Sequence, residues 1–205
     1  MVLEQITRDL DWRESELGSL KILLKNPTIS LKQREVLLRA AWAMLYAHYE
    51  GYSKFCLTVF FDEAQKRVVQ CKNLPTKTRA LALAKTLRKI KSFDSVEMLH
   101  ALEAFPQNCL DGRPDFSEVN TNSNLWPNLL VNLLTSADLN PAVVQGHKTK
   151  IDTLVSRRNG IAYGERDIIK EIDYYLTYEE AVYDVMYALA FEIDRRLNVP
   201  PYKIG

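Results

Sequence analysis

LRAAWAMLYAHYEGYSKFCLTVF, residues 38–60, is the stretch that decides the fold. Its large apolar and aromatic side chains recur every three or four positions, which places them on one face of an α-helix. We expect a long helix that begins near a capping residue at Thr28 or Ser30 and ends at residues 73–75. Gly51 permits a kink or the close crossing of another helix. The expected stripe, packed in the core rather than against a ligand, is Leu38, Trp42, Leu45, Tyr49, Tyr52, Cys56 and Phe60.

The rest of the chain also follows a helical pattern. Strand patterns are nearly absent, and the short alternation at residues 168–175 is too small to build a sheet. The sequence therefore predicts an all-α fold: an antiparallel helical bundle over residues 31–199, preceded by an additional N-terminal helix within residues 1–30. The further helices are expected at residues 2–25, 77–91, 94–105, 125–134, 142–158 and 178–197, with loops at 106–124 and 159–176.

The composition is that of a globular chain with a single core. Its 205 residues are 47% hydrophobic and 26% charged, which excludes general disorder and low-complexity or collagen-like chains. No apolar run approaches the ~20 residues that a membrane span needs, and the N-terminus lacks the pattern of a signal peptide. We therefore expect a cytoplasmic protein with reduced thiols and no membrane partner.

Residue types that bind metals or perform common enzyme chemistry are poorly arranged in this sequence. The odd number of cysteines and the absence of a CxxC pair argue against a zinc framework and against an oxidised scaffold. The histidines are far apart, and none has a second ligand at metal-binding spacing. There is no glycine-rich phosphate loop and no nucleophile elbow. We expect neither a metal nor a cofactor. The side chains considered are Cys56, Cys71, Cys109, His48, His100 and His147.

One segment, LVSRRNGIAYGE at residues 154–165, combines two arginines, an Asn-Gly pair, a tyrosine and an acid around the expected end of a helix. Its composition alone is typical of an ordinary helix terminus, because arginine in a last turn complements the helix dipole. Gly160 or Gly164 can supply the left-handed conformation that ends many helices.

This segment also resembles a family signature. The run RNGIAYGE, residues 158–165, resembles the motif Arg-Asn-x-Ile-Ala-His-Gly-Glu of HEPN domains, which are small helical bundles common in prokaryotic defence systems and toxin–antitoxin pairs. The run LYAHYEGYSK at residues 45–54 is similar to a segment of one branch, the MAE-type HEPN proteins. The loop NTNSNL at residues 120–125 looks like that branch as well. Together the resemblance covers about residues 35–197.

The resemblance implies an activity and a set of site residues. Active HEPN proteins are metal-independent endoribonucleases that work as dimers, with an arginine and a histidine from each subunit around one composite cleft. By position in the motif, the catalytic residues would be Arg158, Asn159 and Tyr163, where Tyr163 stands in place of the histidine. The implied partners are RNA, a second copy joined through the motif-bearing helices, and an antitoxin or another defence-system protein. The residues expected to bind substrate in the same cleft are Arg157, Glu165, His48, Glu50 and Lys54.

The chemistry that the resemblance implies needs charge stabilisation and proton transfer. RNA is cleaved when its 2′-hydroxyl attacks the adjacent phosphate, and arginine can stabilise the five-coordinate phosphate because its planar fork stays charged. Histidine moves protons near neutral pH, whereas an ordinary tyrosine has a pKa near ~10 and is about 0.1% phenolate at pH 7. Tyrosine at position 163 therefore leaves two hypotheses open. One is weak or rewired cleavage with His48 or Glu165 as proton carrier; the other is RNA binding without cleavage.

His147 is a poor substitute for the missing histidine. If residues 142–158 form one helix, it lies roughly 16 Å from Arg158 along the axis. We expect it to make a contact at the surface or at the start of a helix instead.

Charge is unevenly distributed although the net charge is only +1. Residues 66–91 hold nine basic residues and no acidic one, while residues 94–118 are acid-rich with only Arg113 opposing. Such segregation can steer a polyanion. The alternative is a solvated helix face that the neighbouring acidic segment balances in space.

Two functions from other classes compete with the ribonuclease hypothesis. The bundle could be a non-catalytic dimeric adaptor that docks a partner defence enzyme. It could also bind nucleotides without RNA specificity, which the basic segment would permit.

Overall fold

The computed structural model describes residues 2–166 and 171–203 and contains only helices and connecting segments in that part of the chain. The predicted all-α fold is confirmed. None of the helices described is both long and apolar enough to cross a bilayer. The helices are α1 (Val2–Lys25), α2 (Leu31–Arg67), α3 (Thr76–Ala82), α4 (Ala84–Lys91), α5 (Ser95–Glu103), α6 (Pro127–Ser136), α7 (Ala142–Gly146), α8 (Lys148–Ala162) and α9 (Ile172–Leu197), with short helical turns η1 (Cys71–Asn73) and η2 (Pro106–Leu110).

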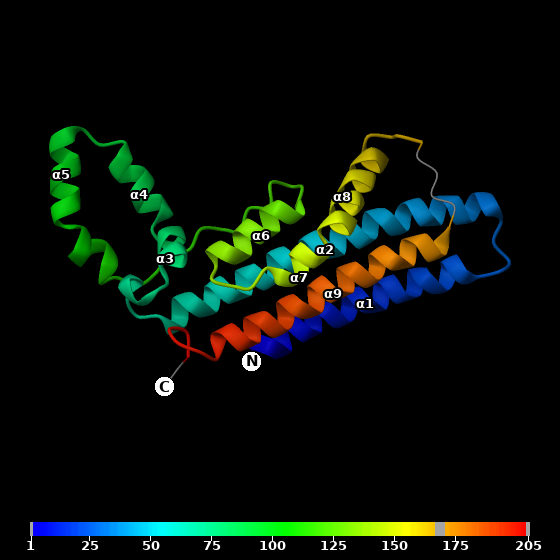
Figure 1. The fold of residues 1–205 in the computed structure, drawn as a ribbon, viewed down its shortest axis with the longest axis horizontal. Helices are drawn as coiled ribbons and strands as arrows, with labels where there is room; N and C mark the ends of the chain where they lie inside the picture. Colours follow the sequence, from blue (N-terminus) through cyan, green and yellow to red (C-terminus); the bar gives the residue numbers. More distant parts are fainter. Residues whose placement is uncertain (1, 167–170, 204–205) are drawn as a thin grey trace.

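Three long helices form the body of the molecule. α1, α2 and α9 lie side by side along its long axis, and α8 packs against α2 and α9 at a steep angle to them (Figure 1). The aromatic stripe of α2 faces inward, and all seven of its side chains are fully buried. α1 contributes to the same hydrophobic core, and a turn at residues 26–30 separates it from α2.

The start of α2 is fixed by a reciprocal cap. The Ser30 hydroxyl accepts a hydrogen bond from the backbone N–H of Gln33 (3.2 Å), and the Gln33 side chain accepts one from the backbone N–H of Ser30 (2.8 Å). Ser30, rather than Thr28, is therefore the cap. The helix ends at Arg67, earlier than predicted, because Val68 is extended and residues 71–73 form a separate turn.

Gly51 of α2 faces Arg13 of α1. A Cβ added to Gly51 would lie 3.1 Å from Nη1 of Arg13, so the missing side chain makes room for this arginine. Arg13 is buried and donates to Asp9 Oδ2 (2.7 Å). Gly51 thus accommodates a side chain of the neighbouring helix.

Several helix boundaries differ from the prediction. The helix expected at 77–91 bends at Leu83, which ends α3 and begins α4. The loop expected at 106–124 begins with the helical turn η2. The helix expected at 142–158 is two helices, because the backbone of His147 (φ −103°, ψ 12°) ends α7 and caps α8.

The loop expected at 159–176 is mostly helical in its described part. Asn-Gly does not stop α8, because the stripe of α8 continues to Ile161, which packs against the core. α9 already begins at Ile172, since this residue and the buried Tyr175 extend its apolar face. The short alternation expected at 168–175 lies partly outside the described residues; Ile172 to Tyr175 are helical.

Candidate functional site

The HEPN-like motif occupies the last turns of α8 and the turn that follows. Gly164 has the left-handed backbone (φ +80°) that reverses the chain. The N–H of Glu165 then bonds to the carbonyl of Gly160 (2.9 Å), and that of Gly164 to Ile161 (3.1 Å). Gly164, not Gly160, is the residue that ends the helix, and Arg158 lies in its last helical turns.

The guanidinium of Arg158 lies over an aromatic ring of α2. Its Cζ is 4.3 Å from the centroid of the Tyr46 ring, and its Nη1 donates to Asn159 Oδ1 (2.9 Å). The side chain is half-buried. Within residues 2–166 and 171–203, no carboxylate forms an ion pair with it. Asn159 is thus the one hydrogen-bond acceptor of this guanidinium within the described residues.

Tyr46 of α2 contacts two segments that are far from it in the sequence: the loop at residues 120–125 and α8. Its side chain is 1% exposed, and its hydroxyl accepts a hydrogen bond from the backbone N–H of Leu125 (2.7 Å). The same hydroxyl donates a long hydrogen bond to Asn124 Oδ1 (3.5 Å). Burial raises the pKa of Tyr46 far above its ordinary value, and the nearby Glu50 carboxylate adds to this increase. The 120–125 loop, α2 and α8 thus meet at one ring.

Glu50 and Lys54 follow Tyr46 on the same side of α2, at four-residue intervals. Oε1 of Glu50 is buried and has no hydrogen-bond partner among the described residues. Lys54 Nζ pairs with Glu118 Oε1 (2.8 Å), and both side chains reach solvent. Lys54 borders a polar hollow of about 380 Å³, lined also by Ser117, Glu118, Val119, Asn120, Thr121 and Ser123.

His48 lies on the opposite face of α2, because it follows Tyr46 by two positions. Its Nδ1 is 3.3 Å from Arg13 Nη1 and its Nε2 is 2.9 Å from Glu16 Oε2. Burial, followed by the Arg13 charge, lowers the pKa of His48. The structure does not bring His48 to Arg158. The expectation that His48 lines the same cleft overlooked the half-turn of helix between Tyr46 and His48.

Arg157 precedes Arg158 on α8 but contacts a different part of α2. It lies over Trp42, one turn before Tyr46, among aromatic rings. Its Cζ is 5.3 Å from the Trp42 centroid and 5.5 Å from that of Tyr174. This side chain links α8 to α2 and α9, a packing role that the motif did not indicate.

Tyr163 and Glu165 lie on the turn after α8. Tyr163 is 83% exposed, and no hydrogen bond or cation–π contact joins its side chain to Arg158 within the described residues. The Glu165 carboxylate covers Gly160, where an added Cβ would lie 2.7 Å from its Oε2. The Glu165 carbonyl accepts a hydrogen bond from Arg39 Nη1 (2.8 Å), which ties this turn to α2.

Two ion pairs balance part of the basic segment. Lys72 pairs with Asp111 (2.7 Å) and Lys85 with Asp115 (3.1 Å), so acids of residues 94–118 lie against bases of residues 66–91. This favours the balanced-surface interpretation at these two lysines. His147 caps α8 and its Nε2 lies 3.0 Å from Asp184 Oδ2, which confirms the expected contact at a helix start.

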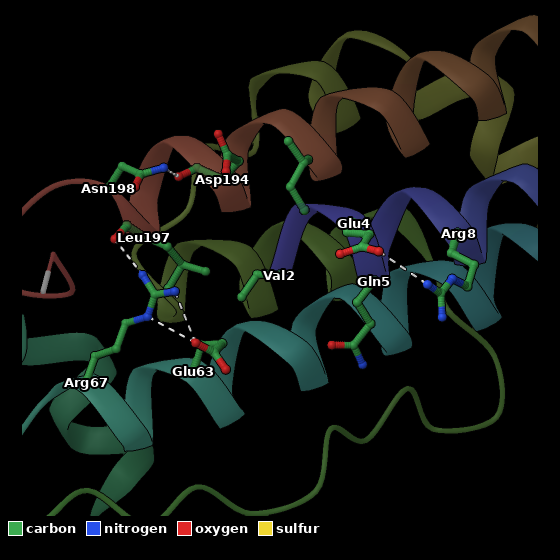
Figure 2. A pocket seen from close by; sticks show the side chains of 10 residues that line it. Val2, Glu4, Gln5, Arg8, Glu63, Arg67, Asp194, Leu197 and Asn198 are labelled. Atoms are coloured by element: carbon green, nitrogen blue, oxygen red, sulfur yellow. Dashed lines mark hydrogen bonds and ion pairs between the residues drawn. The ribbon is translucent and has the colours of Figure 1, made fainter.

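A larger hollow, of about 700 Å³, lies at the other end of α2 (Figure 2). Arg67 donates there to Glu63 Oε2 and to the carbonyl of Leu197 (3.0 Å). Glu63 is 17 positions after Tyr46, about 25 Å along the helix, so this hollow is separate from the motif. No group of three or more metal-ligating side chains occurs among the described residues. The hollow is lined by Val2, Leu3, Glu4, Gln5, Arg8, Glu63, Arg67, Asp194, Leu197 and Asn198.

Sequence reasoning missed Tyr46 as a site residue. The signal was present: Tyr46 belongs to the upstream run that resembles the MAE-type branch, and the two positions after it in helical order, Glu50 and Lys54, were chosen. The contact of Tyr46 with Arg158 joins α2 to α8, and the position of Tyr46 within the upstream run does not indicate it.

The chain was compared with protein families, curated proteins and solved structures. A family model described as HEPN_MAE_28990-like HEPN matches residues 2–202, which includes α1 as well as the motif. No curated protein and no solved structure matches the chain. Because the match extends over nearly the whole chain, this protein belongs to the HEPN superfamily, in its MAE_28990-like branch.

Proposed function

We propose that this protein is an RNA-binding HEPN domain that contacts phosphate through Arg158 and cleaves RNA far more weakly than a HEPN nuclease with the motif histidine. The observation that carries the proposal is the position of Arg158. Its guanidinium lies on a neutral ring, beside Asn159, with no acid of the described chain paired to it. Such a group suits bidentate contact with phosphate oxygens.

The weak-cleavage part of the proposal rests on proton transfer. Position 163 carries a tyrosine, 83% exposed, where the motif has the histidine that exchanges protons near neutral pH. His48 points to α1, and the Glu165 carboxylate lies over Gly160. Neither residue therefore supports the rewired mechanism. General acid–base catalysis is worth roughly 10²–10⁴-fold in rate, which is the loss we expect.

A second copy and a defence setting belong to the same proposal. The exposed turn at Tyr163 lies next to the arginine motif, so two copies joined at their α8 ends would place two guanidinium groups around one strand. The roles in defence or in a toxin module, with an antitoxin-type partner, rest on family membership alone.

The test is an RNA assay in EDTA. The wild-type protein and Arg158→Ala are incubated with a mixed RNA, and binding is measured together with fragments that end in 2′,3′-cyclic phosphate. We expect binding by the wild type, loss of most binding in Arg158→Ala, and new cleavage in Tyr163→His that Arg158→Ala abolishes. Arg8→Ala is the matched control, because Arg8 is an exposed arginine that pairs with Glu4 and with no other acid among the described residues. Equal RNA binding by wild type and Arg158→Ala would exclude the proposal.

The adaptor hypothesis has one observation in its favour. α5 has no buried residue, and three of its apolar side chains are each more than half exposed: Val96, Leu99 and Leu102. An exposed apolar stripe is typical of a docking surface. The adaptor hypothesis would be supported if the protein does not bind RNA and instead binds a partner protein through these three residues.

A further inference from the structure

We propose that Tyr46 is a positioning residue: its ring holds the Arg158 guanidinium in the orientation that meets an RNA phosphate. This inference rests on the proposed function, and it assigns a role to a residue outside the arginine motif. Tyr46 does not touch substrate in this account; it acts through Arg158.

The first step is the geometry of Arg158. An arginine side chain loses much rotamer freedom when it is fixed, so an arginine that is already oriented binds an anion at a smaller entropic cost. Cζ of Arg158 lies 4.3 Å from the centroid of the Tyr46 ring, and Asn159 Oδ1 accepts a hydrogen bond from Nη1. These two contacts hold the guanidinium in place, while its other N–H groups have no acceptor among the described residues.

The second step is the choice of a ring rather than an acid. A carboxylate in this position would orient the arginine equally well, but it would cancel the charge that attracts phosphate. A ring attracts a cation through its quadrupole and leaves the net charge at +1. The tyrosine is held neutral, since burial and the Glu50 carboxylate both raise the pKa of Tyr46.

The third step is the rigidity of the ring itself. Tyr46 is buried on α2, and its hydroxyl is tied to the backbone of Leu125 (2.7 Å). The preceding loop is held in an uncommon conformation, with positive φ at Asn122 and Ser123 (55° and 54°). A ring that is fixed from two elements transmits that order to the arginine that lies on it.

A second arginine–tyrosine pair in the same molecule serves as a control. Cζ of Arg196 lies 4.5 Å from the ring centroid of Tyr202, which is also fully buried. This pair is anchored by the C-terminal end of α9, away from the motif. A variant of Tyr202 therefore removes a buried tyrosine beneath an arginine without changing the proposed site.

The experiment is a double-mutant cycle on the affinity for a fluorescent single-stranded oligoribonucleotide. The variants are Tyr46→Met, which fills space without a ring, Arg158→Ala, and the two combined; Tyr202→Met is the control. We expect Arg158→Ala to weaken binding about tenfold, Tyr46→Met to weaken it nearly as much, and the double variant to bind no more weakly than Arg158→Ala. Tyr46→Phe should stay within about threefold of the wild type, because it keeps the ring. Tyr202→Met should bind as the wild type does.

The outcomes separate the two proposals. If Arg158→Ala binds RNA as the wild type does, the proposed function fails and this inference with it. If Arg158→Ala weakens binding but the effects of the two substitutions multiply, or Tyr46→Met has none, only the positioning role is overturned. Should Tyr46→Met not fold, Arg158→Lys decides, because lysine keeps the charge but lacks the plane that the ring holds. Arg158→Lys should then lose most of the affinity, and wild-type affinity in this variant would overturn the role of Tyr46.

Discussion

The Arg13 guanidinium occupies the space that a side chain on Gly51 would need, with only 3.1 Å between Nη1 and an added Cβ. Gly51→Ala should therefore destabilise the protein by about 1–2 kcal/mol, although alanine favours a helix by about 1 kcal/mol over glycine. The reason is that Arg13 is buried and must shift from Asp9 and His48. Urea unfolding measures the difference. Gly18→Ala, whose added Cβ meets nothing within 4 Å, should instead stabilise by up to about 1 kcal/mol. A stabilised Gly51→Ala would contradict the close fit of Arg13 against Gly51.

Gly164 ends α8 with a positive φ of 80°. Gly164→Ala should cost about 1–2 kcal/mol, because a Cβ is strained in the left-handed region. The control is Gly146→Ala, whose added Cβ meets nothing within 4 Å and whose φ is ordinary. Thermal unfolding of both variants checks the prediction, which fails if the two substitutions change the melting temperature alike.

His48 makes stability depend on pH. Its folded pKa lies below its ordinary value of about 6.5, through burial and the charge of Arg13, although Glu16 and Asp9 oppose this decrease. The unfolded chain therefore binds a proton that the folded chain resists, so the stabilisation is complete above about pH 6.5 and is lost as the pH falls through the folded pKa. Urea unfolding between pH 5 and 7.5 should show this loss for the wild type and a smaller one for His48→Gln. An unchanged pH profile in His48→Gln would exclude the assignment.

Glu118 pairs with Lys54, about two helical turns along α2 from Tyr46, and this contact lowers the pKa of Glu118. Glu118→Gln should raise RNA affinity about two- to threefold, because it frees the lysine and removes a negative charge from the hollow. Glu103→Gln, an exposed acid on α5, controls for net charge. Equal gains in the two variants would mean that Lys54 has no particular role.

The sequence predicted the parts of the fold that depend on periodicity. The α2 stripe from Leu38 to Phe60 follows from a local pattern and is found in the structure; the cap was predicted at Thr28 or Ser30, and the structure uses Ser30. The end of α8 was misplaced because Asn-Gly is a local stop signal, whereas the packing of Ile161 is a tertiary effect.

The candidate site was predictable only where it depends on local helical spacing. Helical spacing places Glu50 and Lys54 on the side of Tyr46, but the same spacing places His48 on the other side, and the motif resemblance obscured that difference. The contact between Arg158 and Tyr46 joins residues 112 positions apart, and no local pattern encodes it.

The most direct test of the account is the salt dependence of RNA binding by wild type, Arg158→Ala and Arg8→Ala. For single strands, the slope of log affinity against log salt concentration falls by about 0.7 for each phosphate contact that is lost. We expect a slope smaller by about 0.7 in Arg158→Ala, or about 1.4 if two copies share one strand, and no change in Arg8→Ala. A slope in Arg158→Ala equal to that of the wild type would contradict the claim that Arg158 holds an RNA phosphate.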